Sequence, residues 1–527
     1  MAASYKLAVI ITNPLNDNEF ILVKQAPPPK FDHEEYDSYV DSHLWDLPSA
    51  QLILQQGGQS NSNVFIQGQD LCSHKIDLTT LDFALALNQG LAQVGFGETS
   101  GTQWKFWKFV EEPDFGPGIP IHTVYITGEL GPDDGFLKEH CKWTSDQSCR
   151  KCLLDVKPSS DRIGPLVVLG PLENSVQSDK WTIPPNLHSQ EYPPGIIIIP
   201  MGSRTAKPYW TTNLVVIASE SSHDNCGDHG FVAHGDALII DPGCRSELHE
   251  KLRDVVAALP RKLVVYVTHH HDDHVDGLLA VQKSNPDASL LAHDNTMRRI
   301  RKDGLSLSHT PVSGAEEICI GGQRLRVISA PGHTDGHMAL LHLSTHSLIV
   351  GDHCVGQGSA LLDISSGGNM NDYFETTYRF MELAPRTLIP MHGRMNLWPK
   401  HLLCEYLKNR RNRESSVLKS IEDGAETLFD IVANVYSKVD RSLWFHAASN
   451  VRLHVDHLAH QDKLPKEFRL QKYQKTCGVH FLSRWLLACA SSRFATKYNK
   501  LGKAKLPCAV ALVVAGLAVI YSARSKA

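Results

Sequence analysis

Three features are scarce or missing in this chain of 527 residues. Its formal net charge is only −5, which excludes a global attraction to nucleic acid and leaves that role to local charge. Its 12 cysteines lack the spacing of a secreted disulfide scaffold, so we expect reduced thiols in the cytosol. The first residues lack the features of a signal or transit peptide, and residues 7–12 predict a strand instead.

The composition is that of an ordinary globular protein. Hydrophobic residues make up 42% of the chain and charged residues 21%, which excludes wholesale disorder. The length predicts two to four domains, and no internal repeat is visible. Residues 213–217, 237–240 and 264–267 are short apolar runs that predict strands of an α/β domain.

Histidine and aspartate gather in four separate clusters in the second half of the chain. Imidazole and carboxylate groups suit Zn²⁺, and four such clusters within one domain length predict a metal site. The clusters are Thr268-His269-His270-His271-Asp272-Asp273-His274, Pro331-Gly332-His333, Gly351-Asp352-His353 and Met391-His392-Gly393.

The spacing within the first cluster favours two metal ions over one. His269 and His271 stand two residues apart in a loop after a predicted strand, so both imidazoles can reach one ion. Asp273 and His274 can turn to a second ion, and the carboxylate of Asp352 can bridge the two. A binuclear site holds its ions about 3.5–4 Å apart and activates a bridging water for hydrolysis.

Together with Ile239-Ile240-Asp241-Pro242-Gly243, these clusters resemble the five ordered motifs of the metallo-β-lactamase fold superfamily. The resemblance implies an α/β fold of the αββα sandwich type and two Zn²⁺ ions per chain. It assigns His269, His271 and His333 to the first zinc, Asp273, His274 and His392 to the second, and Asp352 to the bridge.

The resemblance also implies supporting residues around the ligands. Asp241 matches an aspartate that orders the site from behind, and His337 is expected to pack against the ligands and orient them. Where the family often has two glycines after the first cluster, this chain has Asp276-Gly277. Asp276 is expected either to add a hydrogen bond or to face solvent, and we favour the second.

Residues 333–341 and 409–414 resemble one branch of the superfamily, the lactamase-β-like-protein-2 group, in which a winged-helix-like domain follows the hydrolase. Relatives of that branch include single-strand endoribonucleases, and glyoxalase II thioesterases are more distant. Arg410, Arg411 and Arg413 are candidate contacts to substrate phosphates. The alternative is that these arginines form a solvated basic helix face.

The N-terminal part resembles a Nudix fold that has lost its chemistry. Trp45-Asp46-Leu47-Pro48 is followed by a predicted helix that ends at Gly95. A Nudix helix carries glutamates that bind Mg²⁺, and without them we expect no Nudix hydrolysis. The corresponding positions here hold Asn88, Gln89, Gly90, Ala92 and Gln93.

The C-terminal residues 506–521 are all apolar or small. Their length is near the lower limit of about 17 residues for a membrane-spanning helix. Eleven Lys and Arg residues lie between positions 461 and 505, and basic residues beside a span favour the cytosolic side. We therefore predict a C-terminal transmembrane helix that anchors a cytosol-facing enzyme to an unspecified membrane. The alternative is a buried core helix.

The domain prediction divides the chain into six segments. These are an α+β Nudix-like domain (1–170), a Pro-rich linker (171–195), the hydrolase domain (196–400), a small helical winged-helix-like domain (401–470), a basic juxtamembrane segment (471–505) and the transmembrane helix (506–522).

The predicted activity is zinc-dependent hydrolysis by a metal-bridging hydroxide, which Asp273 and Asp352 would orient. The first candidate substrate is single-stranded RNA, cleaved at a phosphodiester bond. A glyoxalase II-like thioester hydrolase acting on a small molecule is the alternative. A third hypothesis is a non-catalytic scaffold on the membrane. The oligomeric state is left open.

Overall fold

The computed structural model describes residues 3–54, 66–67, 80–97, 103–129, 137–154, 156–157, 160–172, 183–218, 230–300 and 303–498. The chain divides into two compact units. The first consists of Met1–Ala360 and Asp372–Tyr406, and the second of Leu361–Asn371 and Leu407–Ala527.

The N-terminal part of the first unit is built on a mixed sheet. Its central strands β1 and β7 run parallel, and β2 pairs with β1 in an antiparallel hairpin. The described strands are β1 (Ser4–Asn13), β2 (Asn16–Lys24), β3 (Leu44–Asp46), β4 (Ser49–Leu52), β5 (Ile66–Gln67), β6 (Trp104–Val110), β7 (Ile121–Glu129), β8 (Cys141–Ser145) and β9 (Arg162–Ile163). The helices are η1 (Glu34–Tyr36), α1 (Phe83–Val94), α2 (Asp146–Leu154) and α3 (Pro165–Leu169).

Helix α1 is the helix that, by the Nudix resemblance, would carry the acidic metal ligands. Its N-cap Asp82 accepts a hydrogen bond from the Leu85 amide, and Gly95 ends the helix in the left-handed region at φ 102°. The side chain of Gln93 pairs with the backbone of Ser49, at 3.2 Å to its amide and 2.7 Å to its carbonyl. An amide at this position therefore ties helix to strand rather than binding a cation.

Asp46 gives the N-terminal part a pH-dependent stability. Its buried carboxylate accepts hydrogen bonds from the amides of Leu47 and Val167, at 3.0 and 3.1 Å. Burial outweighs these bonds and raises the pKa of Asp46 from 3.8 to about 7. The folded state therefore holds a proton that the unfolded state releases between pH 4 and 7, so this contribution to stability is present at low pH and is lost as the pH rises.

Between pH 5 and pH 7.5 we expect the free energy of unfolding to fall by about 2–4 kcal/mol through this group. Asp46→Asn should flatten that part of the profile, because an amide does not titrate. Urea denaturation of both proteins at the two pH values measures the difference. Parallel profiles for wild type and variant would contradict the assignment.

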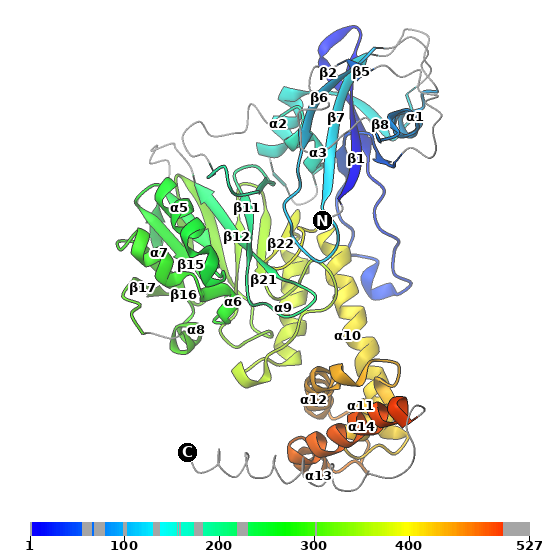
Figure 1. The fold of residues 1–527 in the computed structure, drawn as a ribbon, viewed down its shortest axis with the longest axis vertical. Coiled ribbons are helices and arrows are strands. Elements are labelled where there is room, and N and C mark those ends of the chain that lie inside the picture. Colours follow the sequence, from blue (N-terminus) through cyan, green and yellow to red (C-terminus); the bar gives the residue numbers. More distant parts are fainter. Residues whose placement is uncertain are drawn as a thin grey trace. The chain divides into compact units, whose positions relative to one another are not determined.

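Two facing sheets form the second part of the first unit (Figure 1). The seven-stranded sheet has the order β10 (Gln190–Glu191), β11 (Ile197–Gly202), β12 (Thr211–Ala218), β14 (Ala237–Ile240), β15 (Leu263–Tyr266), β16 (Ser289–Ala292) and β17 (Ser308–Pro311). The six-stranded sheet has the order β13 (Ala233–Gly235), β18 (Glu317–Ile320), β19 (Gln323–Ser329), β20 (Met338–His342), β21 (Ser347–Gly351) and β22 (Thr387–Pro390).

The apolar runs of the sequence become strands that are buried on both faces. In β14, Leu238 and Ile240 pack between the two sheets, while Ala237 and Ile239 pack on the outer side. Helices cover that outer side, with Leu252 and Val256 of α5 among the residues of its core. The described helices of this part are η3 (Ser246–Leu248), α5 (His249–Ala258), α6 (Asp272–Val275), α7 (Leu278–Ser284), α8 (Asp294–Arg299) and α9 (Met370–Leu383).

Helix α9 covers the six-stranded sheet. The hydroxyl of Thr376 donates to the Pro331 carbonyl at 2.7 Å, and Arg379 donates to the Ser329 carbonyl at 2.8 Å. With α5 and α7 on the other sheet, the layers are helix, sheet, sheet and helix. This is the αββα sandwich that the sequence predicts.

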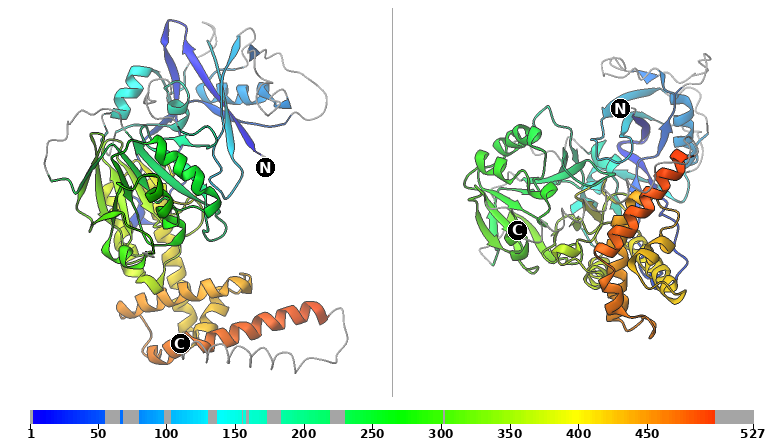
Figure 2. Two further views of the ribbon diagram at one scale, coloured as in Figure 1. Left: turned by 60° about the vertical axis from the view of Figure 1, so that its left-hand side comes forward. Right: turned by 60° about the horizontal axis from the view of Figure 1, so that its bottom comes forward.

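In the part that it describes, the second unit consists of helices (Figure 2). Its core packs Val417, Ile431, Trp444, Val451 and Phe481 together. Thr427 caps one helix by accepting from the amide of Asp430. The elements are the end of α10 (Pro399–Glu422), η4 (Ile364–Ser366), α11 (Leu428–Val435), η5 (Arg441–Leu443), α12 (Trp444–His460), α13 (Leu470–Lys475) and α14 (Val479–Tyr498).

The predicted transmembrane helix and the membrane localisation that depends on it are wrong on this structure. No helix in the described ranges is both long and apolar enough to cross a bilayer. The final described helix, α14, interrupts its apolar residues with Arg484, Arg493 and Lys497. The predicted span at 506–522 lies outside the described residues. An apolar run at the lower limit of length was the physical basis of the prediction, and such a run alone does not define a span.

Candidate metal centre

The four histidine and aspartate clusters meet at one edge of the two sheets. The first cluster follows β15 and leads into α6, and Asp241 follows the neighbouring parallel strand β14. Asp352 and His392 follow the parallel strands β21 and β22. Because parallel strands place their carboxyl ends together, residues more than 100 positions apart in the sequence become neighbours.

His269, His271 and His333 form the first group of candidate ligands. The Nδ1 atom of His271 lies 3.0 Å from Nε2 of His269 and 3.2 Å from Nε2 of His333. With zinc–nitrogen bonds of about 2.0–2.1 Å, the edge of a coordination tetrahedron is about 3.3 Å. Both distances are therefore close to the separation that ligands of one tetrahedral ion have.

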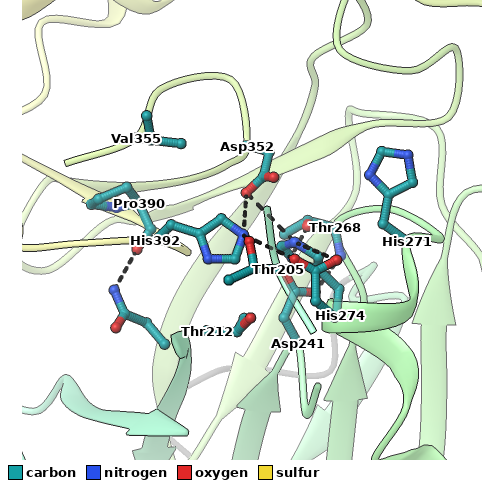
Figure 3. A network of polar contacts seen from close by, with 12 residues as sticks. Thr205, Thr212, Asp241, Thr268, His271, His274, Asp352, Val355, Pro390 and His392 are labelled. Carbon is teal, nitrogen blue, oxygen red and sulfur yellow. Dashed lines mark hydrogen bonds and ion pairs between the residues drawn. The ribbon is translucent and has the colours of Figure 1, made fainter. Parts of the chain in front are cut away.

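Asp273, His274 and His392 form the second group. Nε2 of His392 lies 3.3 Å from a carboxylate oxygen of Asp273. Oδ1 of Asp352 lies 3.4 Å from Nε2 of His392 and 3.5 Å from Nε2 of His274, so it belongs to the same group (Figure 3). These separations also match the edge of a tetrahedral site.

The charges of the second group demand a cation. Burial raises the pKa of Asp352, but His392 and His274 outweigh it and hold that pKa well below its usual value, so the carboxylate is charged. Burial lowers the pKa of His392, but Asp352 and Asp273 outweigh it and raise that pKa to about 10. Two carboxylates thus call for two positive charges, which a divalent ion would supply in place of protons.

The first group has the opposite character. Burial and the neighbouring imidazoles of His274, His271 and His333 hold the pKa of His269 well below its usual value. Its ring is therefore neutral and keeps a lone pair for a metal ion.

In the second group, Nε2 of His274 and Oδ1 of Asp352 are buried and form no hydrogen bond within the structure. These features fit a divalent metal ion at both groups.

Residues behind the ligands hold their rings in place. Asp241 accepts hydrogen bonds from the Thr268 amide at 2.7 Å, from the Thr268 hydroxyl at 2.6 Å and from Nδ1 of His274 at 2.8 Å. The Thr268 hydroxyl also lies 3.0 Å from Nδ1 of His269. The bond to Asp241 fixes the proton of His274 on Nδ1, which leaves Nε2 for a metal ion.

His337 supports the second group through the backbone. Its Nδ1 donates to the Ala330 carbonyl at 3.0 Å, and its Nε2 accepts from the Asp352 amide at 3.0 Å. Burial lowers the pKa of His337 to about 3, which keeps the ring neutral as these two bonds require. At Gly351, with φ +57°, a side chain would come within 2.3 Å of His337, so glycine is needed at that position.

The arginine candidates for phosphate binding belong to the second unit. Arg410 is 5% exposed and donates to Asn450 at 3.2 Å, which removes it from contact with a substrate. Arg413 stacks on the ring of Tyr436, and burial lowers the pKa of Arg411. Burial therefore argues against Arg410 as a phosphate contact, whereas Arg411 and Arg413 are only partly buried and stay candidates.

Sequence reasoning missed several residues that line the centre. Asp276 does not face solvent alone, because Arg204 donates to its carboxylate at 3.0 and 2.5 Å. This pair fixes the loop in which the Thr205 hydroxyl lies 3.4 Å from Nε2 of His392. The Tyr209 ring lies 5.6 Å from that of His392. These contacts join positions 72 to 187 residues apart and leave no local signal in the sequence.

Comparison with known proteins agrees with this geometry. Residues 230–392 match the model of the metallo-beta-lactamase superfamily, and residues 427–467 match that of the beta-lactamase associated winged helix domain. The chain is similar to proteins named beta-lactamase-like protein 2 homolog from Caenorhabditis elegans, 25% identical over 41% of this chain and 72% of the relative, and from Drosophila melanogaster, 26% identical over 38% and 69%. A hydroxyacylglutathione hydrolase of Prochlorococcus marinus is 28% identical over 34% of this chain and 74% of the relative.

Proposed function

Because residues 230–392 of this chain form a metallo-beta-lactamase superfamily domain, we propose that the protein is a two-zinc hydrolase that cleaves phosphodiester bonds in single-stranded RNA. The observation that carries the two-zinc part is the pair of facing ligand groups with tetrahedral spacing. Members of this superfamily are hydrolases, which argues against a non-catalytic scaffold, and that hypothesis also depended on the membrane anchor.

Each part of the centre has a separate task in this reaction. Divalent ions at the two groups would supply Lewis acidity and lower the pKa of a water molecule toward neutrality. The carboxylates of Asp273 and Asp352 accept hydrogen bonds from the attacking water and orient it. The Thr205 hydroxyl lies at the edge of the second group, 3.4 Å from Nε2 of His392. Asp241 and His337 keep the ligand rings and the Asp352 backbone in position.

A basic surface on the second unit supports RNA as the substrate. Between residues 461 and 484, six lysine and arginine side chains are exposed, against the exposed acids Asp462 and Glu467. Exposed cations bind phosphates by counterion release, which makes binding depend steeply on salt. The six are Lys463, Lys466, Arg469, Lys472, Lys475 and Arg484.

Thioester hydrolysis is the second candidate. The observation that favours it is the similarity to a protein named hydroxyacylglutathione hydrolase, which covers 74% of that relative. The same metal centre would activate water toward an acyl carbon, and the basic surface of the second unit would then have no role in binding substrate.

The test is a parallel assay of the zinc-loaded full chain on single-stranded RNA and on a thioester panel that includes hydroxyacylglutathione. We expect RNA cleavage that is abolished by a chelator and restored by zinc. A Lys466→Ala, Arg469→Ala and Lys475→Ala triple variant should raise the KM for RNA and lower the slope of log KM against log salt by about 2, because each phosphate contact on a single strand contributes about 0.7. Its turnover of a small thioester should not change.

Two outcomes would contradict this substrate assignment. Faster hydrolysis of thioesters with RNA left intact would establish the second candidate in its place. Equal RNA kinetics for the triple variant and the wild type would exclude the basic surface as the binding site.

A further inference from the structure

A loop of the N-terminal part, residues 111–120 between β6 and β7, reaches into the hydrolase part of the first unit. Phe115 at its centre is only 1% exposed. The buried residues around Phe115 belong to the hydrolase sheets and include Ile198, Val215 and Met391. A side chain from the N-terminal part therefore belongs to the core between the two sheets, which also contains Met391, the residue that precedes His392.

Residues on either side of Phe115 are held just as closely. The indole Nε1 of Trp210 donates to the Asp114 carboxylate at 3.0 Å. At Gly116, with φ +38°, a β-carbon would come within 2.6 Å of the Trp210 ring. Trp210 directly precedes β12, so the loop is fixed against the first residue of that strand.

Thr211, the first residue of β12, links the loop to a candidate ligand. Its hydroxyl donates to the Phe115 carbonyl at 3.2 Å, and its own carbonyl accepts from Nδ1 of His392 at 2.8 Å. Both Thr211 and His392 are buried. The bond from His392 places the ring proton on Nδ1 and leaves Nε2 facing Asp273 and Asp352.

Arg394 provides a second link two residues after His392. Its guanidinium donates to both carboxylate oxygens of Glu112, at 2.6 and 2.8 Å, and to the Ile119 carbonyl at 2.8 Å. Hydrogen bonding to Glu112 raises the pKa of Arg394, as expected for a two-pronged ion pair. Thr211 thus holds the ring of His392, and Arg394 holds the backbone that follows it. Thr211 and Arg394 are both hydrogen-bonded to loop 111–120.

We propose that loop 111–120 of the N-terminal part positions His392 and so sets the affinity of the second metal position. The inference rests on the two-metal centre of the proposed function and holds for either substrate. The first group is supported by other means, because Thr268 and Asp241 of the hydrolase part hold His269. The N-terminal part thereby contributes to catalysis by holding a candidate metal ligand of the hydrolase part.

The test uses Thr211→Val, which keeps the shape of the side chain but loses the bond to Phe115, with Thr211→Ser as the matched control. Metal-free full-length protein is titrated with Zn²⁺ against a competing chelator, and with Co²⁺ to observe the two positions by absorbance. We expect Thr211→Val to bind its second ion more weakly and its first ion as wild type does. The loss should be smaller than the about 10–100-fold that follows removal of a ligand's own hydrogen-bond partner, because the Thr211 carbonyl that accepts from His392 remains. Thr211→Ser should restore both affinities. Glu112→Gln, which weakens the bond to Arg394, should shift the second affinity in the same direction.

Unchanged second-ion affinity in both Thr211→Val and Glu112→Gln overturns the positioning role. Equal weakening of both ions overturns it as well, because that result reports a general loss of structure. Wild-type protein that binds fewer than two ions contradicts the two-metal centre itself, so failure of the proposed function can be told from failure of this inference.

Discussion

Replacing His271 with alanine is expected to lower hydrolysis by more than about 100-fold and to remove one metal ion per chain. Loss of an outer hydrogen-bond partner alone costs about 10–100-fold, and His271 would contact the metal directly. Its Nδ1 is the atom that lies near both other nitrogens of the first group, at 3.0 and 3.2 Å. Without it, two imidazoles are left, fewer than the three protein ligands of a catalytic zinc site. Metal analysis of the purified variant measures the first effect. Its rate on whichever substrate the parallel assay identifies measures the second.

Asp352→Asn should lower the rate of hydrolysis by a similar factor, because Asp352 belongs to the second group of candidate ligands. The change keeps the shape of the side chain and removes a charge that His274 and His392 both face. His309→Ala and Asp287→Asn are the matched controls, since they make the same chemical changes at exposed positions. Full metal content and wild-type rates in His271→Ala or Asp352→Asn would remove the two-metal centre from the mechanism.

The first cluster of candidate ligands stands out in the sequence because its spacing is local. The short spacing of the first cluster places its candidate ligands, His269, His271, Asp273 and His274, on one turn after a strand. Buried parallel strands are recognisable in the sequence as short apolar runs. The runs at 213–217, 237–240 and 264–267 correspond to β12, β14 and β15. The superfamily assignment is confirmed by the match over residues 230–392, and the winged-helix prediction by the match over residues 427–467.

What the sequence could not reveal are the contacts made by backbone atoms and by distant loops. Every residue has a backbone carbonyl, so nothing in the sequence distinguishes that of Thr211. It nevertheless orients His392 from 181 positions away. Arg410 failed as a phosphate contact for a related reason, because a basic run looks the same whether its side chains are exposed or packed. Asp276 likewise found its partner in Arg204, 72 positions earlier.

Phe115 is the clearest case of such a distant contact, and Phe115→Ala is expected to lower the free energy of unfolding of the hydrolase part by about 3–5 kcal/mol. In the sequence it is one aromatic residue in a segment rich in proline and glycine, and nothing local marks it as buried. In the structure it is 1% exposed, and its removal would leave a cavity between the two sheets beside Ile198 and Val215. Denaturant unfolding measures the change, with Phe115→Leu as the control that refills most of the volume and should cost less than about 1.5 kcal/mol. If alanine costs less than about 1 kcal/mol, Phe115 does not belong to the hydrolase core.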